Sequence, residues 1–317
     1  MTLLTRQSLL TLAPEATYNT APATGYVAIE VLRDPDVAPF VAERVAVETV
    51  RPYWGADRVQ LVNRRVTISL EVYLTGSGTA GTAPAWGPLM LAAGASETIV
   101  ASTSVTYALV NSVSSSLTLR WHTGDGASGG IRHQVTGFRC SSFVVTGNAG
   151  EFPRLRFEGV GIYSTPTALA LPTVAYANQA VPFAITAANT PTVQINSIGN
   201  CMGSFEFTAN NEIDPQDYAG CSQRIVVTGR NCEGSIEVME KLLADQNLYT
   251  LTEGTTLVPI AWTHSGGGAG NTAAISIPNA DILEPTLADR NGTRFINAPY
   301  SAIRTSAATS EFSLVLT

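Results

Sequence analysis

The chain has 317 residues, of which only 14% are charged, and its formal net charge is −7. An average soluble protein has roughly a quarter of its residues charged, so this composition favours surfaces that are buried in an assembly. Lys241 is the single lysine and the arginines form no cluster, which excludes a surface that grips nucleic-acid phosphates.

The distribution of charge and the cysteines indicate which kind of compartment the protein occupies. Residues 1–170 carry equal numbers of basic and acidic side chains, so the whole −7 lies in residues 171–317. No basic leader and no run of roughly 18 apolar residues is found. The four cysteines show no metal-like spacing, and we expect them to be free, buried thiols in a reducing compartment; they are Cys140, Cys201, Cys221 and Cys232.

The first residues predict an arm, a strand, a long hairpin and a second strand. Residues 1–24, rich in Thr, Ala and Pro, are interpreted as an N-terminal arm that orders on assembly. A strand is expected at Tyr26–Val31, and residues 37–58 are expected to form a long hairpin or loop, because prolines interrupt the alternation of valines. The clearest strand is Arg65–Leu74, in which every second residue is apolar.

A short helix and a meander follow. The helix is expected over residues 83–94, because Pro88 suits its first turn and Gly94 its C-terminal end. Ser116–Tyr163 has four short alternating segments separated by Gly, Asn, Asp and Ser clusters, which is typical of an antiparallel meander. Such a sheet must cover its apolar face, and the helix, through Trp86 and Leu89, is the candidate cover.

The second half is predicted to be a separate domain. Residues 166–197 are rich in Pro, Thr and Ala and lack helical periodicity, which is typical of a linker. The linker would separate a first domain at residues 25–165 from a second at residues 198–317. The elements expected in the second domain are strands near Ile225–Thr228, Ser235–Met239 and Phe312–Leu316 and a helix over Glu240–Asn247.

Two short sequences recur in the same order in both halves. SLEVYL at Ser69–Leu74 returns as SIEVME at Ser235–Glu240. LRWHTGDGASGG at Leu119–Gly130 returns as IAWTHSGGGAGN at Ile260–Asn271, so that each half has a Trp-bearing strand that runs into a Gly-rich turn. Either similarity alone is weak. Together they predict a tandem repeat.

The Gly-rich turn matches two catalytic or binding motifs. Gly124–Gly129 fits G-x-G-x-x-G, and Gly126–Gly130 fits G-x-S-x-G around Ser128. A dinucleotide loop and a nucleophile elbow both need a helix after the turn. The residues that follow, IRHQVTGF, alternate like a strand, so the turn is predicted to be a hairpin tip.

The remaining polar groups predict no site either. The three histidines, His122, His133 and His264, lack metal-ligand spacing. The acidic residues Glu212, Asp214 and Asp217 are interpreted as a solvated loop, and Asn291-Gly292 as a turn. We therefore expect no catalytic, cofactor or metal site and no enzymatic activity.

The order of these elements and three of its motifs resemble the major tail tube proteins of long-tailed bacteriophages, best over residues 60–165. The helix resembles P-x-W-x-x-L-x-x-x-x-G, the strand after the turn R-H-x-x-x-G, and the end of the meander N-A-G-E-x-P-x-L-x-F-x-G. The matching residues are Pro84, Trp86, Leu89 and Gly94; Arg132, His133 and Gly137; and Asn148, Ala149, Gly150, Glu151, Pro153, Leu155, Phe157 and Gly159. The second half is included only through the internal repeat.

The resemblance implies a mainly β fold: tandem β-sandwich or half-barrel domains, each with a short flanking helix. Such subunits are expected to join their sheets edge to edge into rings that stack into a tube, through which DNA leaves the capsid without specific binding. Two tube folds per chain would make the ring a trimer with pseudo-sixfold symmetry. The segments 1–24 and 37–58 are the candidates for contacts between rings.

The same resemblance implies partners and a location. The partners would be the tape measure, tail terminator and distal tail proteins, with no membrane, and the protein would assemble in the host cytoplasm and reside in the virion tail. Two alternatives remain open. One is a surface-binding or adhesive β-sandwich module, which would be a dispersed monomer, and the other is an enzyme built around Ser128.

Overall fold

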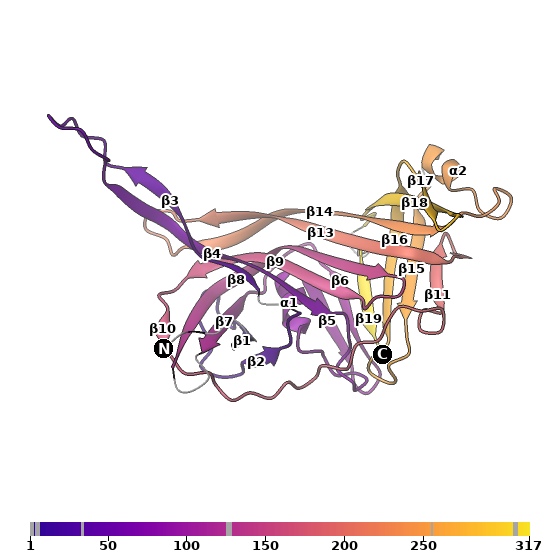
Figure 1. The fold of residues 1–317 in the computed structure, drawn as a ribbon, viewed down its shortest axis with the longest axis horizontal. Coiled ribbons are helices and arrows are strands. Elements are labelled where there is room, and N and C mark those ends of the chain that lie inside the picture. The colour runs from indigo at the N-terminus through magenta and orange to yellow at the C-terminus, as the bar shows by residue number, and fades with distance from the viewer. Residues whose placement is uncertain (1–2, 4–6, 33–34, 125–128, 255, 307–309) are drawn as a thin grey trace.

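The structure is a computed structural model that describes residues 3, 7–32, 35–124, 129–254, 256–306 and 310–317. The fold is mainly β, which confirms the predicted fold class, and the two helices among these residues have six residues each. Figure 1 shows long strands across the top of the molecule and shorter strands below them.

Residues 1–168 supply ten strands and one helix among the described residues. They are β1 (Ser8–Pro14), β2 (Val27–Ile29), β3 (Asp36–Ala46), β4 (Val59–Tyr73), α1 (Gly87–Ala92), β5 (Ala95–Val100), β6 (Ser104–Leu109), β7 (Leu117–Gly124), β8 (Gly130–Asn148), β9 (Arg154–Tyr163) and β10 (Thr167–Ala168).

The described residues after position 168 supply nine strands and one helix. They are β11 (Thr192–Ile195), β12 (Ile198–Gly199), β13 (Met202–Gln216), β14 (Arg224–Met239), α2 (Leu248–Glu253), β15 (Val258–His264), β16 (Ala273–Ile282), β17 (Thr286–Arg290), β18 (Thr293–Ala302) and β19 (Ser313–Leu316).

The upper layer is an antiparallel array that we call the wide sheet. Within the described residues its order is β3–β4–β9–β8–β13–β14–β18–β17, so eight strands lie side by side. Strand β8 of the first half pairs directly with β13 of the second. The wide sheet therefore runs without interruption through both halves of the chain (Figure 1).

The lower layer covers the apolar face of the wide sheet. It contains the run β2–β1–β7, which joins the N-terminal part of β8, and the run β5–β6–β19–β16–β15–β11. The core between the layers is aromatic: Phe143, Phe157, Phe207 and Phe312 are all completely buried. Their ring centroids lie 4.4–6.3 Å apart in the contacting pairs, so residues from both halves share one core.

Helix α1 lies where the sequence predicts a helix and packs as predicted. Pro88 stands in its first turn, and Gly94 follows it with φ +92°, a left-handed conformation that favours glycine. Leu89 and Met90 are completely buried against the sheet. The indole N–H of Trp86 donates to the carbonyl oxygen of Thr75 at 2.9 Å, which ties the start of the helix to the end of β4.

Four predictions about local structure need correction. The meander has three strands, since β8 continues as one strand through Gly137, where the register shifts and φ is +59°. The two strands expected at Ile225–Thr228 and Ser235–Met239 are parts of β14. The second helix begins after Asn247, whose side chain accepts a hydrogen bond from the N–H of Thr250, and residues 240–247 form a turn instead.

The fourth concerns the N-terminal segment. Residues 8–14, which fall within the predicted arm, form β1 and pair with β2 and β7. Leu9, Leu10, Leu12 and Ala13 are buried. This stretch therefore belongs to the core of the single chain. Its removal would expose apolar surface within one molecule, in addition to removing any contact between copies.

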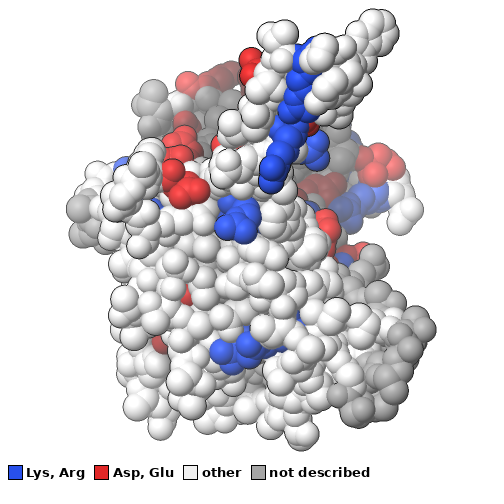
Figure 2. Space-filling model, turned by 90° about the vertical axis from the view of Figure 1, so that its left-hand side faces the viewer, with Lys and Arg blue, Asp and Glu red and all other residues white. Residues whose placement is uncertain are grey.

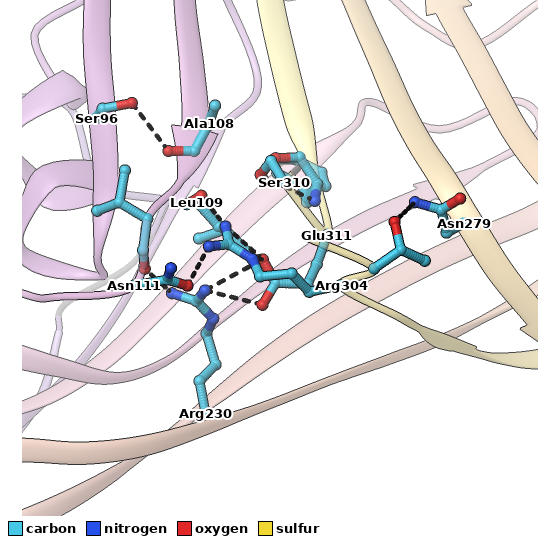
Figure 3. A network of polar contacts seen from close by, with 12 residues as sticks. Ser96, Ala108, Leu109, Asn111, Arg230, Asn279, Arg304, Ser310 and Glu311 are labelled. Atoms are coloured by element: carbon cyan, nitrogen blue, oxygen red, sulfur yellow. Dashed lines mark hydrogen bonds and ion pairs between the residues drawn. The ribbon is translucent and has the colours of Figure 1, made fainter. Parts of the chain in front are cut away.

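A buried ion cluster joins the two halves beneath the wide sheet (Figure 3). The Glu311 carboxylate accepts from Arg230 at 2.9 Å and from Arg304 at 3.0 Å, and the three side chains are only 10–17% exposed. Both arginines also donate to first-half carbonyls, Arg230 to Val110 at 2.9 Å and Arg304 to Leu109 at 2.6 Å. The cluster therefore fixes the second half against the end of β6.

We expect Glu311→Gln to destabilise the chain by about 3–5 kcal/mol, because it leaves two buried guanidinium groups without a counter-charge. The free energy of unfolding from urea titration measures this. Glu43→Gln is the control, since Glu43 forms an exposed pair with Arg65 and its loss should cost about 1 kcal/mol or less. Equal effects of the two substitutions would show that the ion cluster does not hold the halves together.

Candidate assembly surfaces

The wide sheet has a polar face that points away from the core. Alternate residues of each strand turn outward: Ser69 and Glu71 on β4 lie opposite Glu158 and Arg156 on β9. The intervening residues Leu70 and Phe157 are buried. We call the outward side the polar face.

Four arginines of the polar face each form an ion pair with a carboxylate, whereas Arg224 on β14, which the register also places there, donates to the Gln216 side chain instead. Arg154 lies 3.7 Å from Glu71, and Arg65 lies 3.1 Å from Glu43 on β3. The other two pairs are Arg156 with Glu158 and Arg290 with Glu237. Most of the positive charge of this face is therefore matched by a neighbouring carboxylate.

The polar face also carries carboxylates that form no ion pair with any described residue. They are Asp36 on β3, Glu206, Glu212 and Asp214 on β13, and Glu233 on β14, all exposed. Four of the five belong to the second half, in agreement with the uneven charge of the sequence. The polar face is thus net negative, and the excess lies mostly on the β13–β14 hairpin.

The end of the molecule from which β3 and β4 project is different. Figure 2 views this end: basic side chains lie along the projecting hairpin, and the body below it is largely uncharged. Arg44, Arg51 and Arg58 are exposed members of this hairpin. Charge is therefore concentrated on the wide sheet and its hairpins.

The pairing of strands within the wide sheet follows the same order in both halves. Ser69 of SLEVYL pairs with Asp36 on β3 and with Glu158 on β9. Its counterpart Ser235 of SIEVME pairs with Glu206 on β13 and with Pro299 on β18. The units β3–β4–β9–β8 and β13–β14–β18–β17 therefore have matching strands, and Asp36 corresponds to Glu206.

The last strand of each unit matches in the same way. Glu71 on β4 pairs with Arg156 on β9, and Arg156 in turn pairs with Val144 on β8. Its counterpart Glu237 on β14 pairs with Asn297 on β18, and Asn297 in turn pairs with Thr286 on β17. Strand β17 thus stands where the C-terminal part of β8 stands in the first unit.

The two units join where β8, the last strand of the first unit, pairs with β13, the first strand of the second unit. In this junction Glu206 pairs with Thr146 and Thr208 with Val144. The remaining outer strands are β3, paired only with β4, and β17, paired only with β18, among the residues described here. Each leaves one edge of the wide sheet open.

An apolar residue marks the open edge at β17. Val145, on β8, is completely buried, because Phe207 of β13 lies opposite it in the junction. Its counterpart on β17 is Leu287, which is 56% exposed. On the opposite edge, Phe40 of β3 is 42% exposed. Both edges therefore expose an apolar side chain, and at the position of Leu287 the internal junction covers the corresponding residue.

The Gly-rich turn has the predicted context. It joins β7 to β8, so a strand follows it, as in a hairpin. The dinucleotide and nucleophile motifs both require a helix after the turn. Gly126 and Ser128 themselves lie outside the described residues. The Asn291-Gly292 turn is also confirmed: φ is +54° and +83°, and the turn joins β17 to β18.

The histidines, cysteines and acidic residues considered as metal ligands do not lie together among the described residues. His122 pairs with Arg132 and His133 with Trp121 across β7 and β8. Burial, together with the positive charges of Arg132 and Arg120, lowers the pKa of His122 to about 4. Among the described residues no three His, Cys, Asp or Glu side chains are placed to hold a metal ion. The cysteines are free, but the expected burial holds for only two: Cys201 and Cys221 are exposed.

Sequence reasoning missed the open edges, the internal junction and the paired arginines of the polar face. The recurrence of SLEVYL as SIEVME was the one signal that could have located matching strands. No helix in the described part of the chain is long and apolar enough to cross a membrane.

Comparison with known proteins gives one match. A family model described as phage tail tube protein matches residues 5–302, which is nearly the whole chain. A search of curated proteins finds no match.

We expect the polar face to gain affinity for duplex DNA when its arginines lose their partners. The triple variant Glu71→Gln, Glu158→Gln, Glu237→Gln frees three arginines, and each new phosphate contact steepens the dependence of log affinity on log salt by about 0.9. Fluorescence anisotropy at several salt concentrations measures the slope, and a change of up to about 2.7 is expected.

The matched control is Glu206→Gln, Glu212→Gln, Glu233→Gln. It changes the net charge by the same amount but frees no arginine, so its slope should stay close to that of the unmodified chain. If both triple variants gained the same slope, net charge alone would govern binding, and the pairing of arginines would be irrelevant.

Proposed function

The chain belongs to the phage tail tube protein family, and on that basis we propose that three copies close into a ring and that such rings stack into the tube through which DNA leaves the capsid. It is a structural protein of a bacteriophage tail. The observation that carries the proposal is the β8·β13 junction, because it joins two matching four-stranded units within one chain.

The open edges make ring closure the natural outcome. Unpaired strand edges promote association with other chains, and β3 and β17 are such edges at opposite sides of the wide sheet. By the correspondence with β13 and β8, β3 of one copy pairs antiparallel with β17 of the next. The contact joins two different surfaces, and contacts of this kind form rings when the rotation closes.

The internal junction also gives the register between copies. Thr208 pairs with Val144, and the corresponding residues are Ala38 on β3 and Thr286 on β17. In the same way, Asp36 lies opposite Ala288. On the core side of this contact Leu287 then packs beside Val37, which removes its exposed surface from water.

Three copies give a ring with six matching units. Each unit contributes four strands, so the closed inner wall would have 24 strands in three identical arcs of eight. In this arrangement the sequence divides into a first tube domain at residues 25–165 and a second at residues 198–317, with the linker 166–197 between them.

We place the polar face on the lumen. DNA carries a dense negative charge, and a wall that held phosphates would slow its passage. The paired arginines offer no free cation, while Glu206, Glu212 and Glu233 repel the backbone. The lumen therefore guides DNA without binding it. The tape measure, tail terminator and distal tail proteins would be the other partners, and rings would assemble in the host cytoplasm.

The register is tested by joining the edges chemically. In a background with Cys201→Ser and Cys221→Ser, Ala38→Cys and Thr286→Cys place one thiol on each edge. Directly opposed residues of antiparallel strands lie about 4.5–5.5 Å apart, within the reach of a disulfide or a short bis-maleimide. We expect covalent dimers and trimers on denaturing gels, with no species above the trimer.

The single-cysteine variants serve as controls and should not form closed trimers. A ladder that continued to six chains would contradict the trimer. Absence of any cross-link between copies in assembled material would contradict the pairing of β3 with β17.

A further inference from the structure

Strand β3 contains a bulge at the open edge of the wide sheet. Its register against β4 shifts between Ala38 and Val41, where three steps along β3 match two steps along β4. Pro39 and Phe40 therefore share one partner, Val66, as two residues do in a β-bulge. Val66 is buried in the core, so the bulge lies over the apolar side of the sheet.

The ring of Phe40 lies on this apolar side but is only partly covered. It meets the ring of Tyr163 edge to face, with the centroids 4.9 Å apart, and Tyr163 packs against the core. Nevertheless 42% of Phe40 is exposed. The ring is therefore packed on one side and open to a partner surface on the other.

The internal junction shows what faces this position when the edge is paired. Cys232 is the counterpart of Val66, because each lies three residues before the matched serine of its unit. Cys232 pairs with Ala209 on β13, and Ala209 lies opposite Phe143 on β8. Both Ala209 and Phe143 are completely buried. A small residue on β13 therefore faces a large residue on β8.

The open edge at β17 lacks this large residue. By the correspondence of β8 with β17, Phe143 is matched by Pro285, the residue before Thr286. Leu283 and Leu287 lie two residues to either side of Pro285 and are 41% and 56% exposed. This edge therefore presents a small residue between two exposed leucines.

The strand beside β17 also carries a small residue at this point. In the first unit, Phe157 on β9 packs against Phe143, with the ring centroids 6.3 Å apart. Its counterpart on β18 is Ala298. The second unit therefore has an aromatic ring at neither of the two positions.

The chain contains a precedent for the exchange of a large and a small residue between matching positions. A Cβ atom at Gly159 on β9 would lie 2.4 Å from the ring of Phe138 on β8. The matched residues are Tyr300 on β18 and Ala280 on β16, and both are completely buried. The large side chain has moved to the other strand, so the two units fill equivalent space from different positions.

We propose that Phe40 of one copy inserts its ring between Leu283 and Leu287 of the next copy in the ring, and so takes the place that Phe143 has in the internal junction. The inference rests on the proposed function. In the proposed register Ala38 lies opposite Thr286, so the bulge of β3 lies opposite Pro285. The large residue then comes from β3 and the small one from the facing strand, which is the reverse of the internal junction.

The reversed order of sizes also selects the partner of each edge. If β3 met β8 of another copy, Phe40 would face Phe143, and two large side chains would compete for one space. If β17 met β13 of another copy, Pro285 would face Ala209 and leave a gap. Phe40 therefore favours closure of the ring over an exchange of strands between copies.

The first test removes the ring. Phe40→Ala should raise the concentration at which half of the chains are trimers at least about tenfold, because each contact between copies loses its aromatic anchor. Sedimentation velocity over a range of concentrations measures this midpoint. Urea titration of the same variant should show an unchanged free energy of unfolding of the single chain, since Phe40 is exposed there.

The second test exchanges the sizes. Pro285→Phe alone should also weaken trimers, because it places a second ring against Phe40. Phe40→Ala combined with Pro285→Phe should return the midpoint to within about threefold of the unmodified chain, because alanine then faces phenylalanine as Ala209 faces Phe143. Losses that simply add in the combined variant would overturn the proposal.

Phe152→Ala is the matched control. Phe152 is 41% exposed and meets Tyr73 edge to face at 5.5 Å, but it lies in the turn between β8 and β9, so its loss should leave the midpoint unchanged. If Phe40→Ala behaved like this control while the cross-link between residues 38 and 286 still formed, this inference alone would be overturned. Absence of both the cross-link and trimers in otherwise unmodified chains would overturn the proposed ring.

Discussion

Two open strand edges of the wide sheet determine how this molecule can associate with further copies. A β-strand edge presents a row of unpaired N–H and C=O groups, and β3 and β17 each present one. The chain satisfies the same requirement internally, where β8 and β13 pair over seven residues. The exposed Leu287 and the buried Val145 at corresponding positions show how pairing changes the surroundings of one side chain.

The proposed ring assigns different tasks to different surfaces of the molecule. In that proposal the strand edges serve closure and the polar face lines the lumen. Four arginines of the polar face are each paired with a carboxylate, so most of its positive charge is neutralised. The buried cluster of Arg230, Arg304 and Glu311 holds the two units in one orientation, which a ring built from double units requires.

Local patterns predicted local structure well. The alternation in Arg65–Leu74, the Pro88 and Gly94 signals of α1 and the Asn291-Gly292 turn all have short-range causes, and all are confirmed. The second helix begins later than predicted because the side chain of Asn247 caps its N-terminus. The β8·β13 and β6·β19 pairings join segments far apart in sequence, and no local pattern specifies such partners. The exposure of Cys201 and Cys221 depends on the same long-range arrangement.

An end-on reconstruction of the purified tube, at a resolution that separates strands, would show directly how the copies are joined. We expect three full-length chains per ring and an inner wall of three identical eight-stranded arcs, with β17 of each copy antiparallel to β3 of the next. A ring of six full-length chains, or a wall in which β3 and β17 face solvent, would contradict the account.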